Sequence, residues 1–241
     1  SVFALNGLTF LAVAGAVALM RGGLRRSPAA PIVAVSPAEE AAQPIGYQWL
    51  LRREDLVFYS LVSLSLSLLV QATITLFVLR ANTFGLGDGG VGLFYAAVAV
   101  GSLTGSIVAG ASGTWSTPLY PAAIAMTVCA ITLAAFGFSS TILISVLFLV
   151  IAGFATDFYE VVGLTYFQHS IPDVVYGRFF SVFLLALSAG GLVGALAGPL
   201  LERTLGVEGS LAALAAPAIG LALLFVLRSR RWSATEQQLA D

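Results

Sequence analysis

The sequence predicts an all-α membrane protein with seven transmembrane helices, and three observations support this fold class. Of the 241 residues, 59% are hydrophobic and only 10% are charged, whereas soluble domains are about 45–50% apolar and about 25% charged. Apolar residues occur in runs of roughly the 20 residues that a bilayer-spanning helix needs. The apolar/polar alternation of a membrane barrel is absent, and helices pair their own backbone groups in lipid. The seven predicted spans are 2–20, 56–79, 91–111, 119–138, 141–166, 179–200 and 211–227.

The arginines predict how these spans are oriented. All eleven basic residues are arginine, and threading the spans places nine on one side and two, Arg80 and Arg203, on the other. Positive residues accumulate on the cytoplasmic side of membrane proteins. The first span is therefore expected to run inward, and the C-terminus is expected to be cytoplasmic. The net charge of −1 argues against nucleic acid as a partner.

The predicted spans form groups of one and six, separated by a long linker. Prolines oppose regular structure in the first part of the linker. Its second part, IGYQWLLRRED, suits either a short interfacial helix or a frayed start to the next span. Six helices after a long loop and an inward-running helix match the second half of a two-half transporter, whose first five helices would be missing. The predicted units are a helix at 1–22, a cytoplasmic linker at 23–54, the six-helix half at 55–232 and a cytoplasmic tail at 233–241.

Polar residues recur every four positions in one span, as Ser63, Ser67, Gln71 and Thr75. At 100° per residue they stay on one broad helix face. A polar face in lipid needs water or a partner, so this face is expected to line a substrate cavity, with Gln71 touching the substrate. The alternative is that these groups bond to neighbouring helices or to their own backbone.

Two acidic residues interrupt the span 141–166. Asp157 and Glu160 are three positions apart and therefore share a helix face. Charge at the bilayer centre costs about 2.5–3.5 kcal/mol on insertion scales, so the pair must face protein or water. With one member protonated at neutral pH, the pair would couple transport to a proton gradient, Asp157 more than Glu160. The alternative is structural ion pairing, for instance with arginines of the missing half.

Two other spans carry small residues four positions apart, Gly101 and Gly105 in one and Gly190, Gly194 and Gly198 in the other. Such stripes let helix backbones approach closely, so they are interpreted as packing surfaces. Movement along such smooth surfaces would also serve alternating access.

The single cysteine and the single histidine do not predict chemistry. Cys129 lies inside an apolar run and is interpreted as a packing residue. His169 lies at the end of a span and is interpreted as a solvated loop residue. With no second histidine, no metal site is expected, and no cofactor.

The stretch FQHSIPDVVYGRFFSVFLLALSAGGLVGALAGPLL resembles the region of the tenth and eleventh helices in the major facilitator superfamily. It is most similar to the branch of drug and siderophore exporters that includes the enterobactin exporter. That branch often shows a glutamine, a proline and a Gly-Arg pair that opens the next helix. Here these residues are Gln168, Pro172, Gly177 and Arg178, and the resemblance implies that they form a cytoplasmic gate.

Other segments share the resemblance, which covers essentially the whole chain. Asn6 and Phe10 stand where the sixth helix of that branch has an Asn or Asp and a Phe, and GYQWLLRREDL resembles the segment before its seventh helix. Two features depart from the pattern. Tyr176 stands where a second basic residue is frequent, and ASGTWSTPLY lacks the charges that the family often keeps there.

The resemblance implies a partial major-facilitator-type bundle, made of one helix of the N-terminal half and the six-helix C-terminal half as two three-helix inverted repeats. It implies a secondary active transporter in the bacterial inner membrane, a proton-coupled exporter of small amphipathic molecules working by alternating access. The partners would be the lipid bilayer, the missing N-terminal half, protons and a small-molecule substrate. Without the missing half, the chain alone is not expected to transport.

Two other classes remain open at the level of sequence. One is a seven-span receptor or assembly subunit that does not transport. The other is an intramembrane enzyme that uses the two carboxylates and His169. Against an enzyme, no nucleophile–base arrangement or metal-binding cluster is visible in the sequence.

Overall fold

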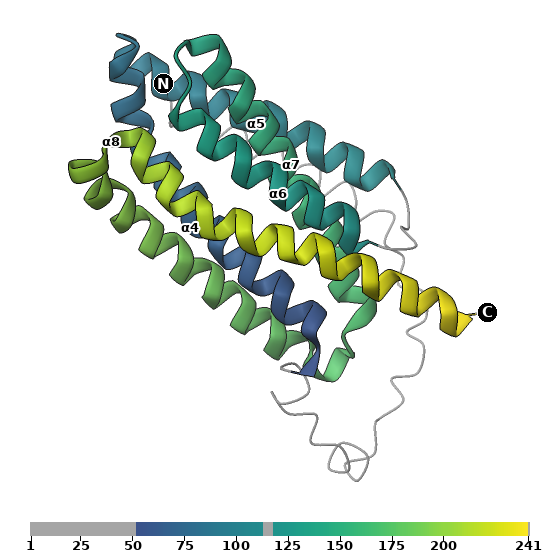
Figure 1. Cartoon of the computed structure of the whole chain (residues 1–241). Helices are drawn as coiled ribbons and strands as arrows, with labels where there is room; N and C mark the ends of the chain where they lie inside the picture. The colour runs from purple at the N-terminus through teal and green to yellow at the C-terminus, as the bar shows by residue number, and fades with distance from the viewer. Residues whose placement is uncertain (1–51, 113–117, 241) are drawn as a thin grey trace, which may run out of the picture. The chain divides into compact units, whose positions relative to one another are not determined.

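The structure, a computed structural model, describes residues 52–112 and 118–240, all within the compact unit Gly46–Asp241. Each of the five helices that it describes is long and apolar enough to cross a membrane. The architecture is therefore all-helical and consistent with a multi-pass membrane protein. In chain order the helices are α4 Glu54–Thr83, α5 Gly87–Ala111, α6 Leu119–Gly137, α7 Ile142–Ser170 and α8 Asp173–Ala240 (Figure 1).

The predicted count of seven helices is not confirmed. The first predicted span, 2–20, lies outside the described residues, and so does most of the linker 23–54. The last two predicted spans both fall within α8, an element of 68 residues that consists of two helices meeting at a non-helical residue, Gly206. Gly206 has φ 69° and ψ 175°, a conformation that glycine adopts readily because it lacks a Cβ. At this break α8 folds back on itself, which gives a first arm (173–205) and a second arm (207–240) (Figure 1).

The helices associate as two close pairs joined by α6. Helix α4 packs mainly against α8, and α5 packs mainly against α7, while α6 contacts both α7 and α8. Residues of the first arm of α8 lie against α4, and residues of the second arm lie against Gly137 of α6.

An aromatic cluster joins α4, α7 and both arms of α8. The Tyr59 ring lies edge-on to Phe167 of α7, with centroids 4.8 Å apart, and 6.2 Å from Phe183 of the first arm. It also lies 6.1 Å from Phe225 of the second arm. These separations suit the attraction between ring edges and ring faces. A second cluster, toward the far end of α4, consists of Phe77, Phe94, Tyr95 and Phe136.

Arg80 is buried at that far end of α4, with 7% of the residue exposed. Its guanidinium donates to the backbone carbonyl of Ser139 and to the Ser139 hydroxyl at 3.3 Å. Carbonyls at the end of a helix lack intrahelical partners, so Arg80 satisfies one just beyond the end of α6. Glu208 of α8 lies 4.0 Å from the same guanidinium. A buried cation thereby holds three helices together at this end, called the Arg80 end.

Candidate binding cavity

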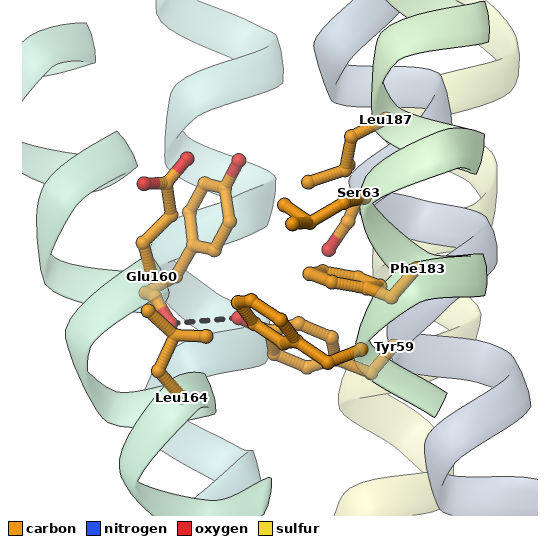
Figure 2. Close-up of a pocket in the computed structure, with 9 residues that line it drawn as sticks. Tyr59, Ser63, Glu160, Leu164, Phe183 and Leu187 are labelled. Atoms are coloured by element: carbon orange, nitrogen blue, oxygen red, sulfur yellow. Dashed lines mark hydrogen bonds between the residues drawn. The ribbon is translucent and has the colours of Figure 1, made fainter. Parts of the chain in front are cut away.

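A cavity of about 100 Å³ lies between α4, α7 and the first arm of α8 (Figure 2). Its walls are mostly aromatic and aliphatic, with one carboxylate and one aliphatic hydroxyl among them. The composition is that of a ligand pocket, where a few polar groups are set in an apolar surface. The lining residues are Tyr59, Ser63, Tyr159, Glu160, Leu164, Phe180, Phe183, Leu184 and Leu187.

Glu160 supplies the carboxylate from the α7 side of the cavity. Figure 2 shows it facing across the space from Ser63 of α4 and Leu187 of α8. The side chain is exposed, and none of the three ion pairs within residues 52–112 and 118–240 includes it. The charge of this carboxylate is therefore not matched by a cation in the part of the chain that the structure describes.

Ser63 supplies the hydroxyl from α4, and it is only 1% exposed. Serines and threonines in membrane helices usually donate to the carbonyl four residues earlier, as Ser60 and Thr73 of the same helix do. The Ser63 hydroxyl has no hydrogen-bond partner of ordinary geometry in the described part of the chain. The polar group next to it is the Tyr59 hydroxyl. An unsatisfied buried hydroxyl costs about 1–3 kcal/mol, so a bound hydrogen-bond acceptor would stabilise the site.

Tyr59 fixes the geometry of one end of the cavity. Its ring is 2% exposed, and its hydroxyl donates to the backbone carbonyl of Tyr159 at 2.8 Å. Gly163, one turn further along α7, leaves the space that the hydroxyl occupies, because a Cβ at this position would overlap it. The hydrogen bond connects α4 to α7 next to Glu160.

An open hollow of about 470 Å³ continues from the cavity along α4 and the first arm of α8. Leu187 borders both spaces. Ser67 and Gln71 of α4 and Ser188 of α8 give this hollow a polar lining. Ser67 also donates to the backbone carbonyl of Leu187 at 2.8 Å. The structure thus provides a small aromatic cavity next to a larger open hollow whose lining is partly polar and partly aliphatic.

The structure distributes the four predicted cavity residues over three environments. Ser63 lines the cavity, whereas Ser67 and Gln71 line the open hollow. Thr75 lines neither space: its hydroxyl donates to the Ala72 carbonyl of the same helix at 2.8 Å.

The two acidic residues of α7 have different surroundings. Glu160 lines the cavity, but Asp157 does not. Asp157 lies at the α5–α7 contact, where the Ser106 hydroxyl donates to its carboxylate at 3.4 Å. Three residues along a helix correspond to a rotation of about 60° between the side chains, enough to direct Asp157 toward α5 and Glu160 toward α4.

The predicted gate residues lie at the connection between α7 and α8. All four are exposed, and none lines the cavity. The carbonyl of Pro172 accepts from the backbone N–H groups of Val175 and Tyr176 at 3.0 Å, which begins α8. The Gln168, Gly177 and Arg178 positions flank this turn. Nearby, Nδ1 of His169 lies 2.8 Å from the Thr165 carbonyl.

A cluster of charged residues where α4 begins, at the Arg53 end, was not anticipated from the sequence. Arg53 donates to both carboxylate oxygens of Asp55, at 2.9 and 2.6 Å. The Tyr166 hydroxyl of α7 donates to the same carboxylate at 2.5 Å. The hydrogen bond to Asp55 raises the pKa of Arg53 above its ordinary value, so the guanidinium remains charged. The charge run RRED signals the acid and base in the sequence, but nothing local to it identifies Tyr166.

The described residues contain no group of three His, Cys, Asp or Glu side chains that could hold a metal ion. Cys129 is buried in α6, with its sulfur 3.3 Å from the Thr156 hydroxyl of α7. Comparison of the chain with protein-family models, curated proteins and solved structures found no match.

Proposed function

We propose that the chain is part of a secondary active transporter, a proton-coupled exporter of small amphipathic molecules that works by alternating access. The observation that carries this proposal is the aromatic cavity with an uncompensated carboxylate, Glu160, between three helices apolar enough to span a membrane. Ionisable groups in membrane helices are expensive and mark substrate or proton pathways. The adjoining hollow supports it, since Gln71 places an amide in its partly polar lining.

In the proposed mechanism, Glu160 and Asp157 exchange protons between the two sides of the membrane. Protonation removes the charge that holds a substrate, so proton and substrate occupy the site alternately. The N-terminal half of the transporter closes the hollow on its open side, and the two halves expose the site to each side in turn. The gate residues at the α7–α8 connection then lie on the cytoplasmic side, together with the C-terminus, in a bacterial inner membrane.

Transport by the protein encoded in its complete reading frame tests the proposal. The protein is reconstituted into sealed vesicles, a pH gradient is imposed, and accumulation of a panel of fluorescent amphipathic compounds is followed. Gradient-driven accumulation is expected for at least one compound and should stop when an ionophore removes the gradient. Failure to move any compound would contradict the proposal.

Variants of the two carboxylates test the coupling. Glu160→Gln and Asp157→Asn remove one titratable group each, so accumulation against a gradient should fall, while exchange of substrate across the membrane continues at saturating substrate concentration. Glu202→Gln is the matched control, because Glu202 lies on the first arm of α8 and lines neither space. Undiminished gradient-driven accumulation in both α7 variants would contradict proton coupling through this pair.

A further inference from the structure

The charges around the cavity favour a positively charged ligand. Glu160 is the charged residue in the lining, and the lining of the hollow is uncharged. Asp157, one turn away on α7, adds a second acidic group whose polar contact is the Ser106 hydroxyl. The arginines that form ion pairs in the described part of the chain bind Asp55, Glu208 and Glu54 instead. An anion in the cavity would meet uncompensated negative charge, whereas a cation would neutralise it.

The rings around the cavity favour an organic cation over a metal ion. Four aromatic residues, Tyr59, Tyr159, Phe180 and Phe183, contribute to its walls. The Tyr59 centroid lies 6.4 Å from that of Tyr159 and 6.2 Å from that of Phe183. Ring faces attract a cation within about 6 Å of the centroid, and such a cation in this cavity is in reach of more than one ring. A metal ion would need several oxygen or nitrogen ligands, and the lining offers one carboxylate.

The size of the spaces sets the shape of the ligand. A volume of about 100 Å³ holds a small head group, whereas sites for drug-sized molecules measure about 300–1,000 Å³. The open hollow of about 470 Å³ beyond Leu187 can accept a longer, polar remainder. The Ser63 hydroxyl, which has no ordinary hydrogen-bond partner in the described residues, can donate to an oxygen next to the head group.

We propose that this cavity binds the ammonium head of an organic cation, with Glu160 neutralising its charge, Tyr59, Tyr159 and Phe183 surrounding it, and Ser63 donating to a nearby ligand oxygen. This proposal rests on the proposed function, since it names the substrate class of the same site. The remainder of the ligand extends along Ser67 and Gln71.

A pair of small molecules that differ only in charge tests the proposal. Choline carries a trimethylammonium head and a hydroxyl, and 3,3-dimethylbutan-1-ol replaces the nitrogen with carbon while keeping the shape. Binding of each to the complete detergent-solubilised protein is measured by titration calorimetry. Choline is expected to bind about tenfold or more tightly than the neutral analogue, as cation–π attraction and charge neutralisation in a partly dry site require.

Variants of the cavity test whether its residues cause the preference for choline over the neutral analogue. Glu160→Gln should weaken choline binding about tenfold and leave the neutral analogue unchanged, whereas Glu202→Gln should alter neither. Phe183→Leu keeps an apolar, somewhat smaller side chain but removes a ring, so it should weaken choline binding more than binding of the analogue. Thermal unfolding of each variant separates loss of binding from loss of the fold. The comparison of choline with its neutral analogue is made on the unaltered protein, so it does not depend on whether a variant folds.

The results also separate this site from the transport proposal. Equal affinity for the two molecules, or no binding of choline, would overturn the cation site even if the vesicles transport neutral or anionic compounds. Choline binding that depends on Glu160, in a protein that transports nothing, would leave the cation site standing and overturn the transporter.

Discussion

Two pairs of helices pack closely at glycine residues: α5 with α7, and α4 with the first arm of α8. They differ in which helix supplies the glycines. In the first pair both helices contribute. A Cβ on Gly101 or Gly105 of α5 would overlap the α7 backbone, and a Cβ on Gly153 of α7 would overlap the Val98 carbonyl of α5. Contacts of this kind bring two helix backbones close on a shared face.

In the second pair the glycines come from α8 alone. Gly190 and Gly194 lie against the carbonyls of Leu64 and Leu68, and Gly198 lies against Ala72 of α4. Because α8 supplies the small residues, α4 keeps its larger and polar side chains on the surface near α8. Helices α5 and α7, which both supply glycine, therefore pack closely along their shared face. Helix α4 and the first arm of α8, where only α8 supplies glycine, leave the space in which the cavity and the hollow form.

Adding one methyl group to each interface should have the largest effect on the free energy of unfolding. Equal effects in the two interfaces would contradict the difference between them. Gly105→Ala places a Cβ into the Phe154 carbonyl, whereas a Cβ at Gly198 meets its nearest atoms at 3.1 Å. Gly105→Ala should lower the free energy of unfolding by about 2–3 kcal/mol, and Gly198→Ala by under about 1 kcal/mol. SDS titration of the protein in mixed micelles measures both.

Gly92→Ala is the control for these substitutions. Gly92 is an exposed position of α5 with no atom within 4 Å of an added Cβ. Because alanine favours the helix over glycine by about 1 kcal/mol, this variant should be unchanged or more stable. A Gly198→Ala loss as large as that of Gly105→Ala would show that the α4–α8 interface is as tight at Gly198 as the α5–α7 interface is at Gly105.

Removing the Tyr59 hydroxyl tests the connection between the two pairs and should have the next largest effect. Tyr59→Phe leaves the Tyr159 carbonyl without its 2.8 Å donor, although the ring remains in the aromatic cluster. The loss is expected to be about 1–1.5 kcal/mol, the net contribution of one buried hydrogen bond, because the Tyr159 carbonyl keeps its bond within helix α7. The same micelle titration measures this loss. Tyr95→Phe is the control, because Tyr95 is an exposed tyrosine of α5. Equal stability of the Tyr59 variant and the control would mean that the hydrogen bond does not hold α4 to α7.

The ionic cluster at the Arg53 end provides a second connection between the pairs, with a smaller expected effect. Asp55→Asn replaces the acceptor shared by Arg53 and Tyr166 with a neutral amide, while the side chain keeps its shape. Because charged hydrogen bonds are about twice as strong as neutral ones, a loss of about 1 kcal/mol is expected. The unfolding titration at low and high salt measures it. A loss that vanishes entirely at high salt would identify the cluster as a surface ion pair.

The neighbouring acid should show the smallest effect. Glu54 pairs with Arg228 of α8 at 3.1 Å, but the two side chains are 65% and 46% exposed. Exposed ion pairs contribute about 0.2–1 kcal/mol and are screened by salt. Glu54→Gln should therefore change the free energy of unfolding by no more than about 0.5 kcal/mol in physiological salt. A loss larger than that of Asp55→Asn would reverse the expected ranking of the two contacts.

Much of the fold was predictable from the chain, and the candidate site was predictable only in part. Hydropathy located α4, α5, α6 and α7 closely, because an apolar run of membrane length is a local property. A connection between the spans 179–200 and 211–227 was predicted, and the structure has a non-helical break at Gly206, where α8 divides into its two arms. The polar face of α4 was recognised by its period, yet the period could not assign Ser63 to a cavity and Thr75 to its own backbone.

The sequence by itself determined the class of the molecule, its helical segments and the presence of acidic groups within them, since each follows from side chains a few positions apart. Tertiary structure alone decided which side chains meet. Glu160 faces Ser63 and Phe183 because α4, α7 and α8 pack together, and Asp55 bonds to Tyr166 for the same reason. Helix pairing depends on the fit of whole surfaces, and the same small-residue stripe fits more than one partner. The cavity is a property of three helices together, and no single segment of the sequence encodes it.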